Sequence, residues 1–414
     1  MINNRFAVLK SKKHIVYCSY DGLLDSLGMS QILPYVEGLN TNSQYLFTII
    51  SFEKKHDNIE FEKLKEFLAS KIITWIPVSY TKKPPILSTI WDVLRLRKTI
   101  SKVSNNKEID LIHCRSYITS LAALSFKKKY NTPFIFDMRG FYADERVDGK
   151  LWNKNKFPFN KIYKYFKKKE REFLEHADYN ISLTENGKKE IESWKLPNQS
   201  PIKVIPCCTD ENLFQTKNIS DKRDELGIKK DDFILSYIGS IGTWYMLDEM
   251  LAFFKVLNEK KSNAKFLFIT KDDPNLIHHK AKQKGISKEK LIIQPSSREL
   301  MPSYIGVSDF SIFFIMPVFS KKASSPTKMG EIMNLGIPII CNSGVGDVDD
   351  IMNECMPELL VKDFEKNEYD RIVNLILNDF KPNKEKIVNT SHQYYSLKQG
   401  VKRYKEVYKE ILGV

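Results

Sequence analysis

The residues best suited to bind an anion lie in the stretch 321–347. Ser325 is a good N-cap and Pro326 a good first helical residue, so a helix is expected to begin there. The backbone N–H groups of Thr327 and Lys328 would then have no partner within the helix and would lie at its positive end. A lysine in the first turn opposes the helix dipole, which costs roughly 0.3–1 kcal/mol unless an anion is bound. This stretch therefore predicts a phosphate-binding helix end, with an ordinary capped helix and a surface lysine as the alternative.

A glycine-containing turn is the second candidate, in the sequence YIGSIGTWYML at residues 237–247. Two glycines between a strand and a helix let the backbone approach a ligand closely, although G-x-x-G alone fits a tight turn without a ligand equally well. One turn beyond Lys328, Glu331 could accept hydrogen bonds from a sugar hydroxyl. The predicted binding residues of this half of the chain are Gly239, Ser240, Gly242, Thr243, Ser324, Ser325, Thr327, Lys328 and Glu331.

The N-terminal half places polar side chains at predicted strand ends and in the loops that follow them. The segments 20–35 and 136–152 each follow a strand, and Ser30 and Gln31 are expected to open the helix after the first loop. Charged and aromatic side chains at this edge of a sheet suit a polar substrate. The alternatives are a surface salt-bridge cluster and, for His113, an ordinary core histidine. The predicted substrate-binding residues are Gly28, Ser30, Gln31, His113, Arg115, Arg139, Asp144, Glu145 and Arg146, next to Asp137 at the strand end.

An alternation of strands and helices is needed to bring these residues together. Short apolar runs such as HIVYCSY, YLFTIISF and PFIFDM alternate with helix-length segments, which indicates a parallel, doubly wound sheet. After a polar stretch from Pro206 to about Asp232 the alternation restarts with FILSYIGS. The predicted fold class is α/β, with two tandem doubly wound, Rossmann-like domains, 1–205 and 206–388, that face each other across a ligand cleft.

Two further segments have an amphipathic pattern. The last stretch has apolar residues at helical spacing from Val401 to Leu412, which favours a packing helix over contact with lipid. The segment 81–102, TKKPPILSTIWDVLRLRKTISK, combines apolar residues with basic ones at Arg95, Arg97, Lys98 and Lys102. It predicts shallow insertion into an anionic membrane surface, unless its apolar residues pack into the domain core.

Composition narrows the class of protein. The 414 residues are 42% hydrophobic and 28% charged, as in globular chains, and no apolar run is long enough to span a bilayer. The polar N-terminus has no signal-peptide pattern, so a cytoplasmic location is expected. The six cysteines form no C-x-x-C pair and are expected to be free thiols. The net charge of +14 fits nucleic acid, an anionic membrane, phosphate-bearing substrates or simply a lysine-rich surface.

Motifs that are missing argue against several classes. The sequence has no P-loop, nucleophile-elbow, zinc-peptidase or clean G-x-G-x-x-G motif. Nucleic acid is not expected as a partner, because lysine greatly outnumbers arginine and no groove-reading helix or aromatic sheet motif is present. The adjacent pairs Asp272–Asp273 and Asp349–Asp350 are poor metal ligands, so neither a metal nor another cofactor is expected.

Taken together, these segments resemble the GT-B glycosyltransferases, in particular the retaining family 4 group of bacterial polysaccharide synthesis, over nearly the whole chain. The resemblance rests on YDGLLDSLGMSQILPY, FDMRGFYADERVDG, VIPCCTDENLF, GSIGTWYML and FSKKASSPTKMGEIMNLGIPII. It implies that domain 1–205 binds the acceptor, that domain 206–388 binds the nucleotide sugar, and that 389–414 returns to the N-terminal domain as a helix. Glu331 matches the second Glu of the family's E-x7-E motif, which binds the donor ribose.

The sequence departs from the family pattern at three places. Ala323 stands where the family has its first Glu. The stretch 240–245 lacks the usual Arg and Lys, and Lys328 would supply the missing charge against the diphosphate. Asp137 stands where many members have a His that contacts the donor sugar.

The resemblance implies an activity and its partners. A sugar would pass from a nucleotide-diphosphate sugar to a glycan or lipid-linked acceptor with retention, and the leaving phosphate itself would take the acceptor proton. Asp137, Arg139 and Lys328 are the expected catalytic residues. The expected location is the cytoplasm, peripherally at the inner face of the cell membrane. Two alternatives remain: a nucleotide-sugar 2-epimerase on the same fold, and a catalytically silent GT-B partner subunit.

Overall fold

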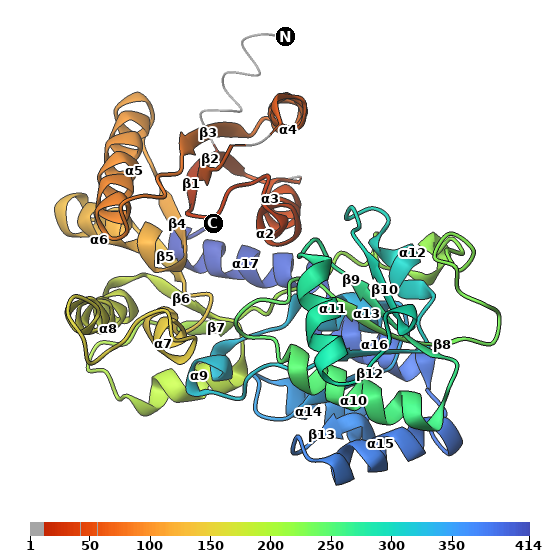
Figure 1. The fold of residues 1–414 in the computed structure, drawn as a ribbon. Coiled ribbons are helices and arrows are strands. Elements are labelled where there is room, and N and C mark those ends of the chain that lie inside the picture. The colour runs from red at the N-terminus through yellow and green to blue at the C-terminus, as the bar shows by residue number, and fades with distance from the viewer. Residues whose placement is uncertain (1–11, 42, 56) are drawn as a thin grey trace. The chain divides into compact units, whose positions relative to one another are not determined.

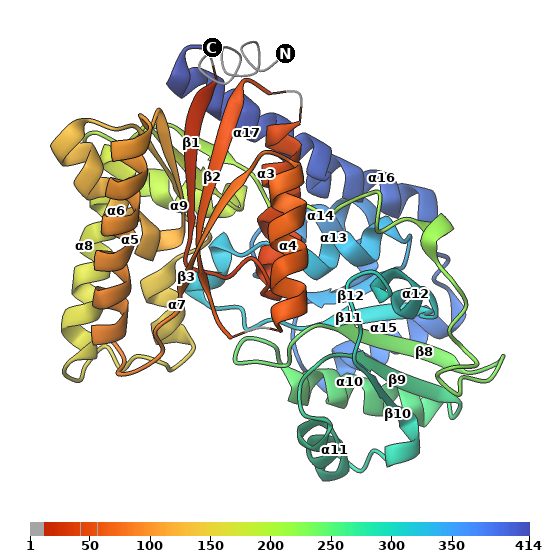
Figure 2. The ribbon, with the colours of Figure 1, turned by 90° about the horizontal axis from the view of Figure 1, so that it is seen from above.

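A computed structural model describes residues 12–41, 43–55 and 57–414 of the chain. They form two compact units, shown in Figures 1 and 2. The N-terminal unit runs up to Pro206 and also contains Leu397–Val414, and the C-terminal unit is Cys207–Ser396. Each unit has its own parallel sheet, so the expected pair of doubly wound α/β domains is confirmed.

The N-terminal unit is built on a seven-stranded parallel sheet with the strand order β3-β2-β1-β4-β5-β6-β7. Its central strands are almost entirely buried, as strands with both faces covered must be. In the register of the sheet, Arg115 pairs with Ser19 on one side and with Asp137 on the other, so three strands end at one edge. The strands are β1 (Lys13–Ser19), β2 (Tyr45–Glu53), β3 (Thr74–Ser79), β4 (Leu111–Arg115), β5 (Phe134–Asp137), β6 (Tyr179–Ser182) and β7 (Ile202–Val204).

Helices cover both faces of this sheet. The helices α5, α6 and α8 lie side by side on one face in both views, and α3 and α4 lie on the other (Figures 1 and 2). The last helix, α17, packs against α3. The helices of this unit are α2 (Ser26–Gln31), α3 (Leu33–Asn40), α4 (Asn58–Ser70), α5 (Leu87–Asn106), α6 (Ser116–Tyr130), α7 (Tyr142–Asp148), α8 (Phe159–His176), α9 (Glu185–Ser193) and α17 (Leu397–Leu412).

The C-terminal unit has a six-stranded parallel sheet with the order β10-β9-β8-β11-β12-β13. The strands are β8 (Phe233–Ile238), β9 (Ala264–Ile269), β10 (Leu291–Gln294), β11 (Phe310–Phe313), β12 (Ile339–Asn342) and β13 (Leu360–Val361). The helices are α10 (Leu247–Lys260), α11 (Pro274–Gln283), α12 (Met301–Gly306), α13 (Thr327–Asn334), α14 (Val348–Cys355), α15 (Lys366–Asn378) and α16 (Lys384–Tyr395). Short 3-10 turns lie at η1 (Thr216–Asn218), η2 (Lys288–Lys290), η3 (Phe319–Ala323) and η4 (Pro357–Leu359).

The return of the chain to the N-terminal unit begins at Leu397, later than the predicted boundary at 388/389. Helix α16 belongs to the C-terminal unit because it packs closely on α13. A side chain at Gly330 would collide with Tyr395, and the Ser391 hydroxyl donates to the Gly330 carbonyl over 3.3 Å. Glycine on α13 therefore sets the distance between these two helices.

Two expectations about the whole chain can be compared with the described residues. None of the described helices combines the length and hydropathy needed to cross a bilayer. All six cysteines are free, and five of them are buried.

Candidate active site

Lys328 is buried in the first turn of α13, where only 7% of its surface is exposed. Its Nζ donates to the Tyr237 hydroxyl over 3.0 Å and lies 3.7 Å above the Tyr245 ring. A Cβ at Gly239 would come within 3.4 Å of the same Nζ. Burial lowers the pKa of Lys328 well below its usual value, although the charges of Glu331 and Asp272 oppose that shift. The alternative of a surface lysine is wrong.

The predicted start of α13 needs a correction. The helix begins at Thr327, with an extended Pro326 at the N-cap position, and not with Ser325 as the cap. The Ser325 hydroxyl instead accepts a hydrogen bond from the Cys207 backbone N–H over 3.2 Å. Ser325 thus lies one residue before the N-cap, and its hydroxyl contacts the start of the unit.

The glycine-containing turn after β8 is held in place by one carboxylate. Asp272 accepts hydrogen bonds from the Ser240 hydroxyl, over 3.0 Å, and from the Ile241 backbone N–H. Gly239 has a φ of +97°, which favours glycine. Gly242 and Thr243 are exposed at the tip of the turn. The turn after β8 and the first turn of α13 thus meet at Lys328.

Glu331, one turn further along α13, is buried beside an arginine. Its Oε1 accepts from Arg298 over 3.0 Å. Burial raises the pKa of Glu331, and the Arg298 guanidinium opposes that shift. Of the other predicted donor-binding residues, Ser324 and Thr327 are half-buried at the start of the helix. This geometry places a lysine and a glutamate one turn apart on α13.

In the N-terminal unit, Asp137 is fully buried at the end of β5 and has three polar neighbours. The Tyr404 hydroxyl donates to its Oδ2 over 2.9 Å, His113 Nε2 lies 3.5 Å from the same oxygen, and an Arg139 nitrogen lies 3.7 Å from Oδ1. Burial alone would raise the pKa of this carboxyl group, but Arg139, His113 and Arg115 together lower it to about 2. Asp137 is therefore a carboxylate.

Helix α17 also reaches His113. The Tyr408 hydroxyl lies 2.7 Å from His113 Nδ1, and the ring is fully buried. Burial lowers the pKa of His113, and the hydrogen bond to Asp137 only partly opposes that shift. A neutral ring can donate from Nε2 to Asp137 and accept from Tyr408 at Nδ1. The alternative of a satisfied core histidine thus fits its surroundings.

Arg139 and Arg115 complete this polar cluster. Arg139 has a left-handed backbone with a φ of +60°, followed by Gly140 at +118°, which turns its side chain back toward Asp137. Arg115 is buried, and its Nε lies 3.4 Å from an Asp21 carboxylate oxygen. The carboxyl ends of β4 and β5 thereby hold two arginines close to one buried carboxylate.

The remaining residues predicted in the loops of this unit have mostly structural contacts. Asp144 on α7 accepts from Tyr163 over 2.7 Å and from Lys167 over 2.8 Å, as in the alternative of a salt-bridge cluster. Arg146 lies over the Tyr142 ring, and Glu145 is half-buried.

The first loop differs from the prediction in its helix start. Helix α2 begins at Ser26 and ends at Gln31, so Ser30 and Gln31 close the helix and do not open it. Gly28 has no room for a side chain, because the backbone carbonyls of Gly22 and Leu23 lie against it. Ser30 donates to the Ser26 carbonyl over 2.7 Å, and both Ser30 and Gln31 are buried. Gly28, Ser30 and Gln31 therefore have packing and hydrogen-bonding roles within the loop and α2.

Several residues of the site were not predicted from the sequence. Tyr237 and Tyr245, whose rings lie against Lys328 Nζ, flank the two glycines of the turn, and this flanking is the one pattern that could have indicated them. Asp272 and Arg298 come from distant loops and could be found only in the fold. Tyr404 and Tyr408 have the spacing of a packing helix face, which gives no hint of their hydroxyl contacts.

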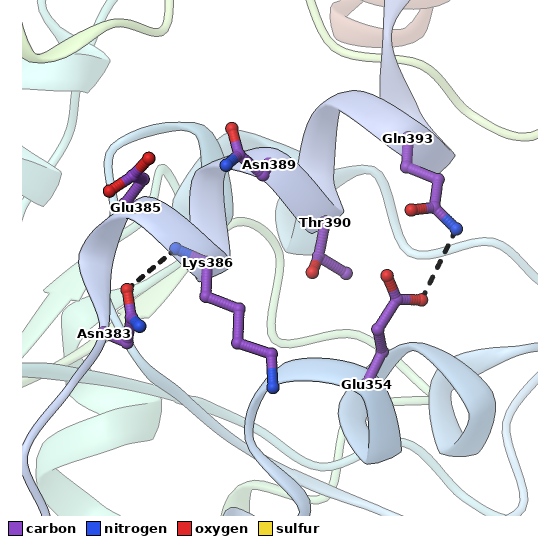
Figure 3. A pocket seen from close by; sticks show the side chains of 7 residues that line it. All are labelled: Glu354, Asn383, Glu385, Lys386, Asn389, Thr390 and Gln393. Carbon is purple, nitrogen blue, oxygen red and sulfur yellow. Dashed lines mark hydrogen bonds between the residues drawn. The ribbon is translucent and has the colours of Figure 1, made fainter.

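Two other features of the described residues bear on ligand sites. No group of three or more His, Cys, Asp or Glu among them is arranged to hold a metal ion. A polar pocket lies between α14 and α16, where Glu354 accepts from Gln393 over 3.5 Å and Asn383 caps α16 by accepting from the Lys386 backbone N–H (Figure 3). This pocket contains none of the predicted site residues.

Comparison with known families covers both units. Residues 51–213 match Glycosyltransferase Family 4, and residues 218–393 match Glycosyl transferases group 1. The chain belongs to the GT-B glycosyltransferases of the family 4 type, and it is a glycosyltransferase. The predicted family and enzyme class are thus confirmed. A search of curated protein sequences found no significant match.

Solved structures share the fold at low sequence identity. Sucrose-phosphate synthase from Thermosynechococcus elongatus has a TM-score of 0.75 at 13% identity, covering 97% of this chain and 100% of that one. A glycosyltransferase from Rickettsia africae has a TM-score of 0.70 at 16% identity, covering 97% and 99%. Anabaena HepE in complex with UDP and glucose has a TM-score of 0.68 at 13% identity, covering 95% and 99%.

Proposed function

We propose that this glycosyltransferase transfers a sugar, with retention, from a nucleotide-diphosphate sugar to a glycan or lipid-linked acceptor in the synthesis of a cell-surface polysaccharide. The proposed binding of the sugar donor rests on one observation. Lys328 is buried at the start of α13, between the turn after β8 and Glu331. UDP is the nucleotide to test first, because it is bound in the HepE structure.

The proposed chemistry places charge on the leaving diphosphate. The Lys328 ammonium and the first backbone N–H groups of α13 would neutralise the charge that develops as the sugar departs. In a retaining transfer the leaving phosphate can take the acceptor proton, so the protein's main task is positioning. Glu331 would hold the ribose hydroxyls. In the N-terminal unit, Arg139 and the Asp137 carboxylate that faces it would contact the transferred sugar or the acceptor.

A transfer assay tests this function directly. The protein is incubated with a panel of nucleotide sugars, and the release of nucleoside diphosphate is measured with and without glycan acceptors. Product NMR should then show the donor's anomeric configuration in the new linkage. Interconversion of the donor at sugar C2, without release of nucleotide, would instead establish the epimerase alternative. Inversion of the anomeric centre would overturn the retaining mode.

We further propose that the protein works in the cytoplasm as a peripheral protein of the inner membrane face, where a lipid-linked acceptor would lie. An apolar ridge on the first two turns of α5 supports this location. The ridge consists of Ile86, Leu87, Ile90, Trp91 and Leu94, which are 37–64% exposed. Val93, Leu96 and Ile100 of the segment 81–102 pack inside, so the packing alternative explains only part of its apolar side chains.

The cations beside this ridge differ from the expected set. Arg95 donates to the Ser79 carbonyl over 2.9 Å and Arg97 to the Leu121 carbonyl over 3.1 Å, so both guanidinium groups serve the fold. The exposed cations around the ridge are Lys82, Lys83, Lys98 and Lys102. Asp92, the one acidic residue between 81 and 107, is buried.

A further inference from the structure

A largely buried cluster of charged side chains joins α8 to α7. Lys167 Nζ donates to Asp144 Oδ2 over 2.8 Å and also pairs with Glu170, whose side chain is fully buried. The Tyr163 hydroxyl donates to the other oxygen of Asp144 over 2.7 Å. The Tyr117 hydroxyl of α6 donates to Glu170. Two carboxylates therefore share one lysine, and each also accepts from one phenol.

The charges of this cluster depend on one another. Burial lowers the pKa of Lys167, but the Glu170 and Asp144 carboxylates reverse that shift, so its pKa lies above the usual value and the side chain is an ammonium. Burial raises the pKa of Glu170, and Lys167 and Tyr117 only partly oppose that shift. Loss of the ammonium would leave two nearby buried carboxylates without the cation that they share. Lys167 is therefore the residue that holds the cluster together.

The same lysine lies close to the first residues of α7. Its Nζ is 5.9 Å from the centre of the Phe141 ring and 4.8 Å from that of Trp194, and the two rings pack together at 5.7 Å. Phe141 is buried at the N-cap position of α7, where an apolar side chain cannot accept a hydrogen bond from the helix amides. A helix of seven residues is too short to be stable by itself. Contacts from α8 and from the end of α9 therefore fix where α7 begins.

The turn just before α7 has a backbone conformation that needs support. Arg139 has a φ of +60°, and Gly140 has a φ of +118°. A left-handed backbone is unfavourable for a residue with a side chain, and it persists where the surrounding structure holds it. On one side of the turn, the Met138 backbone N–H donates to the Ile181 carbonyl of β6 over 3.1 Å. On the other side, the cluster holds α7 through Asp144.

We infer that Lys167 is a positioning residue for Arg139. By pairing with the two carboxylates it fixes α7. The fixed helix keeps the turn in the conformation that brings an Arg139 nitrogen within 3.7 Å of Asp137. Lys167 acts on Arg139 through α7 and is not itself a catalytic residue. The inference rests on the role that the proposed function gives to Arg139 and the Asp137 carboxylate.

Transfer kinetics and calorimetry of the full chain test the inference. Lys167→Met keeps a long side chain and removes its charge. It should lower kcat by about tenfold to a hundredfold, because a displacement of about 1 Å in a positioned group can cost that much. The UDP affinity of this variant should stay unchanged, since the proposed nucleotide contacts lie in the other unit. Lys167→Arg, which keeps the charge, should retain most of the wild-type kcat.

The matched control lies two residues further along the same helix. Lys169 pairs with Glu172 over 2.9 Å, and its side chain is 22% exposed, against 25% for Lys167. Lys169→Met should therefore leave kcat unchanged. A loss of kcat in Lys169→Met as large as in Lys167→Met would assign the effect to the general charge of α8 and overturn the inference.

A second background shows whether the effect passes through Arg139. Arg139→Ala should itself lower kcat, and the addition of Lys167→Met should then have little further effect, because both changes remove the same contribution. Equal losses from Lys167→Met in the wild-type and Arg139→Ala backgrounds would show that Lys167 acts only on the folded state in general, which would overturn the inference.

A charge-neutral variant excludes misfolding as the cause. Asp144→Asn, Lys167→Met and Glu170→Gln together remove the ions without leaving an unpaired carboxylate, so this triple variant should fold as the wild type does. It should still show the loss of kcat, because neutral side chains hold α7 less firmly. A wild-type kcat in the folded triple variant would show that the ion pairs do not position Arg139.

Hydrogen exchange supplies a readout that does not depend on the reaction. In Lys167→Met the backbone amides of 138–148 should exchange faster than in the wild type, because α7 opens more often, and in Lys169→Met they should not. Unchanged exchange would overturn the inference whatever the donor. A wild-type kcat in Lys167→Met, with a lowered kcat in Arg139→Ala, would overturn the inference and leave the proposed function standing. A wild-type kcat in Arg139→Ala would remove Arg139 from the proposed function and the inference with it, while the separate transfer assay still tests sugar transfer.

Discussion

At the residue scale, the surroundings of Lys328 make its charge depend on a ligand. Its Nζ is bonded to a phenol and not to a carboxylate, in a buried setting that disfavours the ammonium form. Lys328→Ala should therefore weaken UDP binding by about 1–3 kcal/mol, the range for a charge-assisted hydrogen bond. Calorimetry measures this effect. Lys322→Ala, which removes an exposed lysine six residues earlier, is the matched control and should bind UDP normally. Equal affinities of wild type and Lys328→Ala would remove this residue from the donor site.

The same lysine predicts a pH dependence of binding. Burial lowers its pKa in the free protein, and a bound diphosphate favours the ammonium, so the pKa must rise on binding. Between the free and the bound pKa, UDP binding should take up a proton, and affinity should fall as the pH is raised through that window. Calorimetry in buffers with different ionisation enthalpies measures the proton uptake. Lys328→Ala should abolish the Lys328 component, and an unchanged proton count in that variant would contradict this prediction.

Glu331 allows the ribose and the phosphate contacts to be separated. Its side chain lies one turn away from Lys328 and accepts a hydrogen bond from Arg298. Glu331→Gln, which keeps the shape, should weaken UDP binding while leaving inorganic pyrophosphate nearly unaffected, because pyrophosphate has no ribose hydroxyls. The expected loss is about 1–3 kcal/mol for hydrogen bonds to a charged acceptor. Parallel losses for both ligands, measured by competition calorimetry, would argue against the ribose role.

At the element scale, helix α17 does more than close the N-terminal unit. Its Tyr404 and Tyr408 hydroxyls contact Asp137 and His113 directly. Tyr404→Phe should lower kcat while leaving UDP affinity unchanged, because the proposed nucleotide contacts lie in the other unit. The hydrogen bond to the carboxylate is worth roughly 1.5–3 kcal/mol, so the pKa of Asp137 should rise by about 1–2 units in the variant.

The matched control for this prediction lies on the neighbouring helix. Tyr35 is equally buried and packs edge-on against the Tyr404 ring, but its hydroxyl donates to the Pro206 carbonyl over 3.0 Å. Tyr35→Phe should lower the free energy of unfolding by roughly 1 kcal/mol without a selective effect on kcat. If both variants change kcat and unfolding to the same extent, the Tyr404 hydroxyl is only a packing contact.

At the scale of the whole molecule, the source of the positive charge that stabilises the leaving diphosphate predicts how the reaction responds to chelators. The ammonium of Lys328 and the start of α13 would neutralise the leaving diphosphate by themselves. Transfer should therefore survive EDTA with little change in rate. Loss of activity that Mg²⁺ or Mn²⁺ restores would show that a divalent cation shares this task. An inactive protein in both conditions would count against the proposed donor.

The fold was predictable from the sequence because its signals are local. Apolar runs such as those of β1, β2 and β5 are separated by helix-length segments. This alternation indicates that the strands pair in parallel in one buried sheet. Helix starts were less certain. Ser325 has the side chain of a cap, but its hydroxyl is engaged by Cys207, 118 residues away in the sequence. The local pattern indicates that a helix begins in this stretch, but the exact first residue is the least certain part of such a prediction.

The sequence by itself determined the two α/β units, the position of Lys328 and Glu331 on one helix, and the basic, apolar pattern of α5. Only the tertiary structure decided that Lys328 is buried between two tyrosines, that α17 supplies the hydroxyls around Asp137, and that the α5 ridge is exposed. The physical reason is that helix and strand patterns depend on neighbours within a few residues. Burial and hydrogen-bond partners depend on which distant segments the folded chain brings together, and the charge state of a buried group follows from both.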